Sequence, residues 1–172
     1  MKRIVQVFLI LTAGCSQGGD MSVANMYLTT NKTKPIGTVV FVDTPDGLQI
    51  DVDLTNLPAG PHGFHIHEHP DCGVVINENG VKGYALKAGG HYDPLHTKIH
   101  LGPDNAGHKG DLPVLYVKQD GTVQTHILIR SLTTEDIKNR SVIVHAGSDN
   151  YKDTPAISGG GGARIACGII KN

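Results

Sequence analysis

The clearest pattern along the chain is an alternation of apolar and polar residues that is typical of β-strands. Residues 48–54 (LQIDVDL) place every second side chain on one apolar face, as expected for a strand with one face in a core. Amphipathic helical periodicity is almost absent, apart from a short helical turn expected at 133–136. Strand character recurs at 24–30, 37–42, 62–69, 115–118, 122–130, 141–145 and 164–170. The pattern therefore predicts an all-β domain.

Turn sequences separate these strands, and two long stretches have no periodicity. Gly121 lies in a turn that predicts a hairpin between 115–118 and 122–130. Residues 70–113 and 146–163 are rich in glycine and polar residues and show no strand pattern. Connections this long are uncommon in a compact domain unless something else orders them. We expect a Greek-key β-sandwich or flattened barrel of about eight antiparallel strands with two long functional loops.

Composition agrees with a single turn-rich domain and narrows the choice of partners. The 172 residues include 22 Gly, 9 Pro and no Trp, and this length suits one domain with its own core. The 15 basic and 16 acidic residues nearly balance, which argues against nucleic acid as the main partner. Ten histidines are an unusual load, and most of them lie between His62 and His108.

The N-terminus has the pattern of an export signal. Lys2 and Arg3 precede a mostly apolar run at 4–11, which is too short to span a bilayer as a permanent helix. The following LTAGC resembles a bacterial lipobox, in which Cys15 would become the acylated first residue of the mature chain. An ordinary secretory signal cut nearby and a plain N-terminal anchor are the alternatives.

This reading predicts three regions in the chain. Residues 1–14 are expected to be a signal peptide, 15–23 a lipidated N-terminus and flexible tether, and 24–172 the folded domain. The protein would then lie in the periplasm or cell envelope, anchored to a membrane by lipid alone.

A pair of histidines in the stretch 62–69 offers the first metal-binding hypothesis. On an extended strand, residues two apart share a face and lie roughly 6.6 Å apart. His65 and His67 can therefore reach one metal ion together. His62 is expected on the other face, and His69 lies too far along the strand.

The long loop supplies a second set of ligands. His91, His100, His108 and Asp111 are spaced by nine, eight and three residues. Three imidazoles and one carboxylate form a four-coordinate set suited to zinc. With His65, His67 and His145 the ligands outnumber what one ion needs, and nitrogen ligation by the strand histidines suits copper.

Cysteine usage fits an exported protein. If Cys15 carries lipid, Cys72 and Cys167 remain as an even pair that could form a disulfide. The alternative is two free thiols.

Six sequence segments together carry a family resemblance. They are HGFHIHE, AGGHYDP, HLGP, GHKGDLP, VHAGSDN and GGGGARIACGII, in that order along the chain. This set is similar to that of the bacterial periplasmic copper,zinc superoxide dismutases, and the likeness covers about residues 24–170. The resemblance implies an immunoglobulin-like sandwich, a fold to which general accounts already assign this enzyme.

The resemblance also implies a role for each matched residue. Copper would be held by His65, His67, His91 and His145, and zinc by His91, His100, His108 and Asp111, so that His91 bridges the two ions. Asp149 would link His65 to His100, and Arg164 would draw the anionic substrate to copper. Cys72 and Cys167 match the family disulfide.

The remaining histidines and three lysines are expected to be less direct participants. His62 matches a structural position, and His69 and His126 are expected at the surface. His96 competes with His100 for zinc, and the LGP sequence after His100 favours His100 as the ligand. The lysines Lys82, Lys87 and Lys152 could contribute to a positive funnel above copper or be ordinary surface charges.

The implied function is dismutation of superoxide to oxygen and hydrogen peroxide by an enzyme with one copper and one zinc per chain. A non-catalytic copper- or zinc-binding protein of the same fold is the main alternative, and a zinc hydrolase is a weaker one because the expected zinc set is already full. Bacterial relatives include monomers and dimers, so the resemblance leaves a homodimer open.

Overall fold

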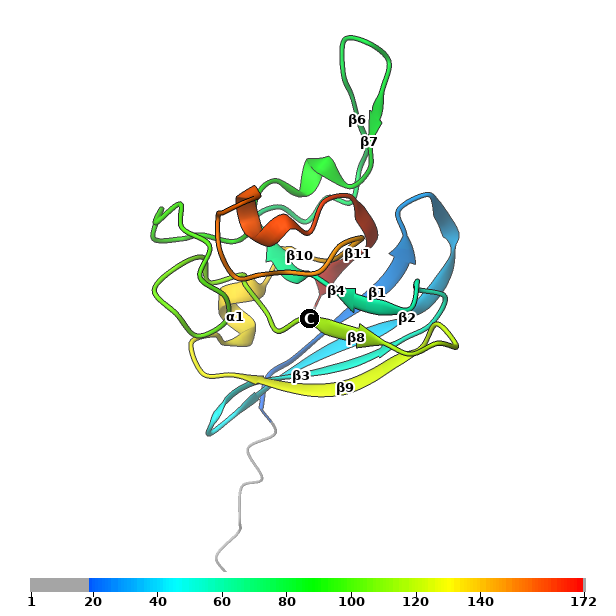
Figure 1. Cartoon of the computed structure of the whole chain (residues 1–172). Helices are drawn as coiled ribbons and strands as arrows, with labels where there is room; N and C mark the ends of the chain where they lie inside the picture. Colours follow the sequence, from blue (N-terminus) through cyan, green and yellow to red (C-terminus); the bar gives the residue numbers. More distant parts are fainter. Residues whose placement is uncertain (1–18, 172) are drawn as a thin grey trace, which may run out of the picture.

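The structure is a computed structural model that describes residues 19–171 and consists mostly of β-strands (Figure 1). The strands are β1 (Met21–Leu28), β2 (Asn31–Thr44), β3 (Gly47–Leu54), β4 (Gly60–His62), β5 (Phe64–His67), β6 (Val75–Ile76), β7 (Lys82–Gly83), β8 (Leu115–Val117), β9 (Val123–Ile129), β10 (Ser141–His145) and β11 (Arg164–Lys171). The helical elements are α1 (Thr134–Ile137) and the 3-10 turns η1 (Leu86–Ala88) and η2 (Ile157–Gly160). Within this described range, no helix has the length and apolar character needed to cross a membrane.

Seven strands form one antiparallel sheet in the order β5-β10-β11-β1-β2-β3-β9. The sheet curls, and the separate pair β4–β8 lies between β10, next to the β5 edge, and β9 at the opposite edge (Figure 1). Neighbours such as β1 and β11 come from opposite ends of the sequence. The predicted all-β sandwich or flattened barrel is confirmed.

The core lies inside this curl and follows the alternation in the sequence. On β3, Leu48, Ile50, Val52 and Leu54 are buried, whereas the alternate residues Gln49, Asp51 and Asp53 are partly or fully exposed. Phe41 of β2 is the register partner of Ile50 and is also fully buried. Burying side chains of this size contributes about 2 kcal/mol each relative to exposure, which is why the pattern fixes the register.

The structure corrects three local predictions. Residues 115–118 and 122–130 do not form a regular hairpin, because β8 pairs with β4 while β9 pairs with β3. The turn at Gly121 therefore takes the chain from one sheet to the other. The histidine strand is divided at Gly63, so that His62 ends β4 and Phe64 begins β5.

The third correction concerns the start of the domain. β1 begins at Met21, inside the predicted tether of residues 15–23, and Met21 and Val23 pair with β2. Both residues are ordered by pairing with β2, and Val23 also pairs with Lys171 of β11. The predicted signal peptide and Cys15 lie outside the described residues.

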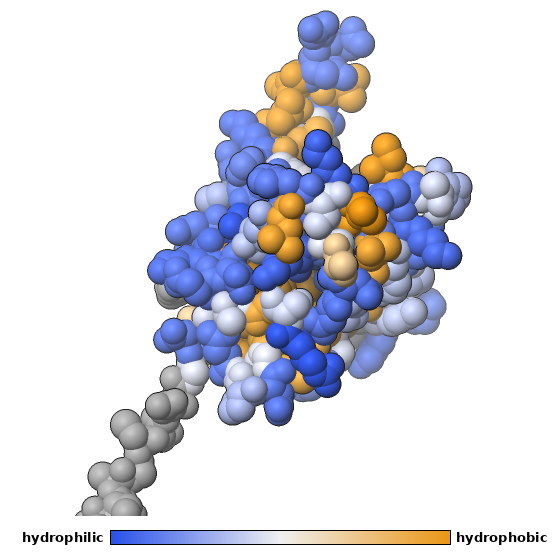
Figure 2. Space-filling view, turned by 90° about the vertical axis from the view of Figure 1, so that its left-hand side faces the viewer, coloured by the Kyte–Doolittle hydropathy of each residue, from blue (hydrophilic) through white to orange (hydrophobic). Residues whose placement is uncertain are grey.

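The first long loop contains a projecting hairpin. β6 and β7 pair with each other, and Val75, Ile76 and Val81 are 42%, 61% and 61% exposed. Figure 2 shows apolar side chains gathered along this projection. The predicted functional loop is thus not wholly irregular, although most of it lacks a strand partner.

Candidate metal centre

Strand β5 anchors both ends of the loop that carries most of the histidines. The Ile66 N–H donates to the Gly110 carbonyl at 2.9 Å, and the Tyr92 N–H donates to the Ile66 carbonyl at 2.9 Å. Isolated bridges pair His65 with Asp111 and His67 with His91. The segments around residues 91 and 110 therefore lie beside the strand histidines. Main-chain pairing with β5 brings together ligands that are far apart in sequence.

The first group consists of four buried histidines, His65, His67, His91 and His145, whose ligand atoms lie within 4.8 Å of one another. His65 and His67 share one face of β5, as the sequence predicts. His145 ends β10, where the register with β11 shifts between Val144 and His145. A shift of this kind redirects a side chain out of the regular alternation. His67 Nε2 and His145 Nε2 are 3.3 Å apart.

The second group is built around the buried carboxylate of Asp111. Its members are His91, His100, His108 and Asp111, with ligand atoms again within 4.8 Å of one another. The Nδ1 atoms of His91, His100 and His108 lie 3.0, 2.8 and 3.5 Å from the Asp111 oxygens. His91 belongs to both groups. Since its Nδ1 faces Asp111, its Nε2 is left for the first group.

Asp149 contacts one histidine of each group, His65 in the first and His100 in the second. One of its oxygens lies 2.7 Å from His65 Nε2, and the other lies 2.7 Å from His100 Nε2. A carboxylate in this position fixes the tautomer of each imidazole and aims the opposite ring nitrogen at the metal position. The arrangement is the one that the resemblance implies for Asp149.

Several buried nitrogens have geometry that suits a cation. The Nδ1 atoms of His65, His100 and His108 are buried without a hydrogen-bond partner. His100 Nδ1 is close to Asp111, but the geometry is not that of a hydrogen bond. Buried polar atoms are normally satisfied, so unpaired imidazole nitrogens that converge near a carboxylate fit a metal ion with nitrogen and oxygen ligands.

The two groups differ in how their imidazoles titrate. Burial, with a smaller contribution from the nearby His65, lowers the pKa of His91 to about 4 and that of His145 to about 2. Burial would also lower the pKa of His100, but its contacts with Asp111 and Asp149 raise that pKa to about 9. The first group is therefore a set of neutral nitrogen donors, whereas the second is strongly influenced by its carboxylates.

Arg164 lies at the edge of the first group. Its guanidinium donates to the Ala85 carbonyl at 2.7 Å and to the Gly89 carbonyl at 2.6 Å. The Gly89 carbonyl also lies 3.1 Å from His67 Nδ1. Burial lowers the pKa of Arg164, but an arginine remains charged. A fixed positive charge is therefore held beside His67.

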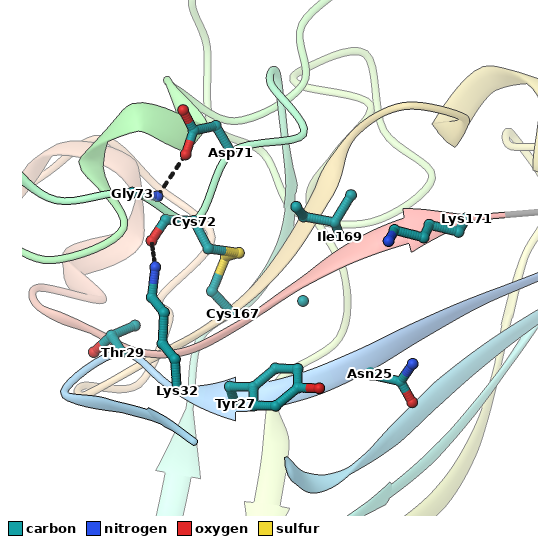
Figure 3. Close-up of a pocket in the computed structure, with 11 residues that line it drawn as sticks. Asn25, Tyr27, Thr29, Lys32, Asp71, Cys72, Gly73, Cys167, Ile169 and Lys171 are labelled. Atoms are coloured by element: carbon teal, nitrogen blue, oxygen red, sulfur yellow. Dashed lines mark hydrogen bonds between the residues drawn. A yellow bond between two sulfur atoms is a disulfide. The ribbon is translucent and has the colours of Figure 1, made fainter. Parts of the chain in front are cut away.

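The disulfide between Cys72 and Cys167 is present, with a Cα–Cα distance of 5.9 Å. It ties the first long loop to β11, three residues after Arg164 begins that strand. Figure 3 shows the disulfide beside a pocket of about 350 Å³, where Lys32 donates to the Cys72 carbonyl. None of the clustered histidines lines this pocket. The pocket beside the disulfide is therefore separate from the two histidine groups.

The histidines outside the two groups have other environments. The two ring nitrogens of His62 face the carbonyls of His145 and Pro58 at 2.7 and 2.8 Å, which leaves neither free for a metal. His69 and His96 are exposed. His126 is 78% exposed as predicted, and it pairs with Asp51 at 2.6 Å.

The three lysines considered for substrate guidance, Lys82, Lys87 and Lys152, are exposed. Their contribution to a positive funnel stays a prediction.

Two supporting residues in the second loop were not found from the sequence. Asp153 accepts the backbone N–H of His100 at 2.9 Å and that of Ser158 at 3.2 Å. The hydroxyl of Tyr151 accepts the backbone N–H of Val114, three residues after Asp111, at 2.9 Å. Both lie in a stretch with no periodicity or motif, so no signal pointed to them except their closeness to Asp149.

Comparisons with known proteins agree with this geometry. A family model described as copper/zinc superoxide dismutase matches residues 35–170. The chain is 45% identical over 168 residues to the Cu-Zn superoxide dismutase of Legionella pneumophila, covering 98% of this chain and 97% of that one.

Solved structures give the same answer. The Cu/Zn superoxide dismutase from Brucella abortus matches with a TM-score of 0.82 and 45% identity, covering 87% of this chain and 99% of that chain. The solution structure of the monomeric copper, zinc superoxide dismutase from Salmonella enterica matches with a TM-score of 0.77 and 41% identity, covering 88% of this chain and 100% of that chain. The fold and the paired histidine groups define a two-metal β-sandwich protein. The chain belongs to the copper/zinc superoxide dismutase family.

Proposed function

We propose that this chain catalyses the dismutation of superoxide, in which two superoxide anions and two protons give oxygen and hydrogen peroxide. Copper would be held by His65, His67, His91 and His145, and zinc by His91, His100, His108 and Asp111. The observation that carries the proposal is the position of His91, whose ring belongs to both buried groups. An imidazolate can ligate one ion through each nitrogen.

The metals and the protein have separate parts in this chemistry. When bound, copper supplies the one-electron acceptor and donor for superoxide, and zinc supplies a fixed positive charge. The protein supplies neutral imidazoles, because burial keeps the pKa values of His91 and His145 well below 7. Asp149 holds His65 and His100 in the tautomers that this ligand arrangement needs.

Arg164 would bind and orient the substrate. A guanidinium has five N–H donors in a fixed plane, and Arg164 uses Nη1 on Ala85 and Nη2 on Gly89. Other donors remain for an anion beside the first histidine group. A positive charge in a recess raises the association rate of a small anion, an effect for which superoxide dismutase is a standard example.

His91 would also handle a proton. Its Nδ1 lies 3.0 Å from Asp111 on the zinc side, so Nε2 is the atom that can accept a proton when it is not ligated and deliver it to the product.

The alternative functions explain fewer of these features. A non-catalytic metal-binding protein has no need of Arg164 at the site, and a zinc hydrolase needs an open zinc position, whereas four ligands already surround this one.

The bridging role of His91 can be tested with His91→Ala. The variant should lose or weaken binding of both copper and zinc, since both groups lose a ligand, as measured by metal analysis of protein loaded under conditions that give one of each in the wild type. His126→Ala removes an exposed histidine and serves as the control. Weakening of only one metal would contradict the bridge.

The envelope location remains part of the proposal. The LTAGC sequence supports acylation of Cys15 after removal of residues 1–14. Cys15→Ser should yield a soluble or uncleaved protein, as measured by membrane fractionation and labelling with a radioactive fatty acid. An unchanged membrane fraction would contradict lipidation.

A homodimer also stays a prediction, and light scattering of the metal-loaded protein tests it.

A further inference from the structure

Tyr151 is held in a fixed place directly behind Asp149. Its backbone N–H donates to Asp149 Oδ1 at 2.7 Å, the same oxygen that lies 2.7 Å from His100 Nε2. The residue adopts φ +57°, in the left-handed region that side chains other than glycine rarely occupy. This backbone conformation turns the ring of Tyr151 away from its own loop.

The ring lies against Gly102 in the other metal loop. A Cβ added to Gly102 would come within 2.8 Å of the Tyr151 ring, so no larger residue fits while the ring stays there. The Gly102 N–H donates to Asp111 Oδ2 at 3.3 Å. The aromatic ring of Tyr151 therefore packs against Gly102, whose N–H donates to the Asp111 carboxylate.

The hydroxyl of Tyr151 reaches a third segment. It accepts the N–H of Val114 at 2.9 Å, and Val114 follows Asp111 by three residues. One side chain thus contacts the chain on both sides of Asp111, while its backbone holds Asp149. Burial raises the pKa of Tyr151, which keeps the hydroxyl protonated and uncharged at neutral pH.

From these contacts we propose that Tyr151 is a positioning residue that locks the loop carrying Asp149 onto the loop carrying His100 and Asp111, and thereby slows the release of zinc. The inference rests on the zinc assignment in the proposed function. It goes beyond that assignment because Tyr151 is not a ligand. A ligand set whose supports cannot move apart loses its ion more slowly, since several contacts must break together.

The test measures the rate at which the metal-loaded protein transfers zinc to a chromogenic chelator. Tyr151→Ala removes the ring and the hydroxyl and should release zinc at least tenfold faster than the wild type. Tyr151→Phe keeps the ring on Gly102 and should fall between the two. Tyr116→Ala, which removes a tyrosine that is 75% exposed, should release zinc at the wild-type rate.

A glycine pair tests the same contact from the opposite side. Gly102 and Gly80 both have φ +77°, but a Cβ on Gly80 would meet nothing within 4 Å. Gly102→Ala should speed zinc release because the new methyl displaces the ring. Gly80→Ala carries the same backbone strain and should not.

Two further readouts separate positioning from general stability. Cobalt(II) placed in the zinc position should show a changed visible spectrum in Tyr151→Ala and a spectrum restored toward the wild type in Tyr151→Phe. Urea unfolding of the metal-free variants shows how much of the effect exists without metal. If Tyr151→Ala does not fold, the Gly102→Ala and Tyr151→Phe rates decide.

Zinc release at the wild-type rate and an unchanged cobalt spectrum in the folded variants would overturn the inference. A wild-type protein that binds no zinc would instead contradict the proposed function.

Discussion

Buried imidazoles flanked by carboxylates make up the chemistry of this protein at the scale of single residues. His91 and His145 are kept neutral by burial, whereas Asp111 and Asp149 favour protonation of His100. Burial alone would raise the pKa of Asp111, but the three histidines around this carboxylate hold its pKa far below the usual range. These opposite shifts have consequences for the metal-free protein.

The stability of the metal-free protein should be greatest near pH 6.5. Below that pH the unfolded chain takes up protons that folded His91, with a pKa of about 4, does not, so stability falls as the pH drops. Above it, folded His100, with a pKa of about 9, keeps a proton that the unfolded chain releases, so stability falls as the pH rises.

Urea unfolding in a chelator between pH 5 and 9 measures this dependence, and each decline should be on the order of 1 kcal/mol or more. His100→Gln should lose the alkaline decline. Stability that rises steadily from pH 6.5 to 9 in the wild type would contradict the assignment.

Arg164→Ala should lower the dismutation rate by about tenfold while copper and zinc contents stay normal. The reason is that the site loses the fixed positive charge that attracts the anionic substrate. Steady-state dismutation and metal analysis on the same preparation provide the measurement. Arg130→Ala removes an exposed arginine and should have no such effect. Loss of copper from Arg164→Ala would show that the residue holds the site together instead.

At the scale of elements, the site depends on loops that have few strand partners. Main-chain pairing with β5 fixes residues 91 and 110, and the disulfide fixes Cys72 to β11. A cross-link across 95 residues lowers the entropy of the unfolded chain, and in the chain-entropy model this stabilises the folded state by roughly 4–5 kcal/mol. These connections give the first loop the order that its sequence pattern alone would not provide.

Elements could be predicted from sequence where the signal is local. The alternation of β3 and the short helical turn α1 are local patterns, and in the structure Thr133 caps this turn in a capping box with Asp136. The partner of β8 is not a local property. Residues 115–118 look like half of a hairpin, but closure of the barrel pairs them with β4.

The candidate site likewise has features that follow from local sequence and features that depend on contacts between distant segments. His65 and His67 could be paired from strand geometry, and the seven candidate ligands could be named from spacing and family resemblance. The hydrogen bonds of Asp153 with His100 and of Tyr151 with Val114 span 53 and 37 residues of sequence and follow no periodicity, so only the three-dimensional structure reveals them.

At the scale of the whole molecule, a curled sheet brings β5, β10, the start of β11 and two long loops to one site. β11 lies between β10 and β1, so His145, Arg164 and the disulfide are carried on adjacent strands. The near-balanced net charge of −1 gives no overall attraction for an anion. The proposed attraction must therefore be local, and it should weaken as salt increases.

The most direct test of the central claim is the decay of superoxide in the presence of the metal-loaded protein, followed by stopped-flow absorbance. We expect decay that is proportional to protein concentration, is lost after chelation and returns when copper and zinc are both restored. Decay at the uncatalysed rate by protein that holds one copper and one zinc would contradict it.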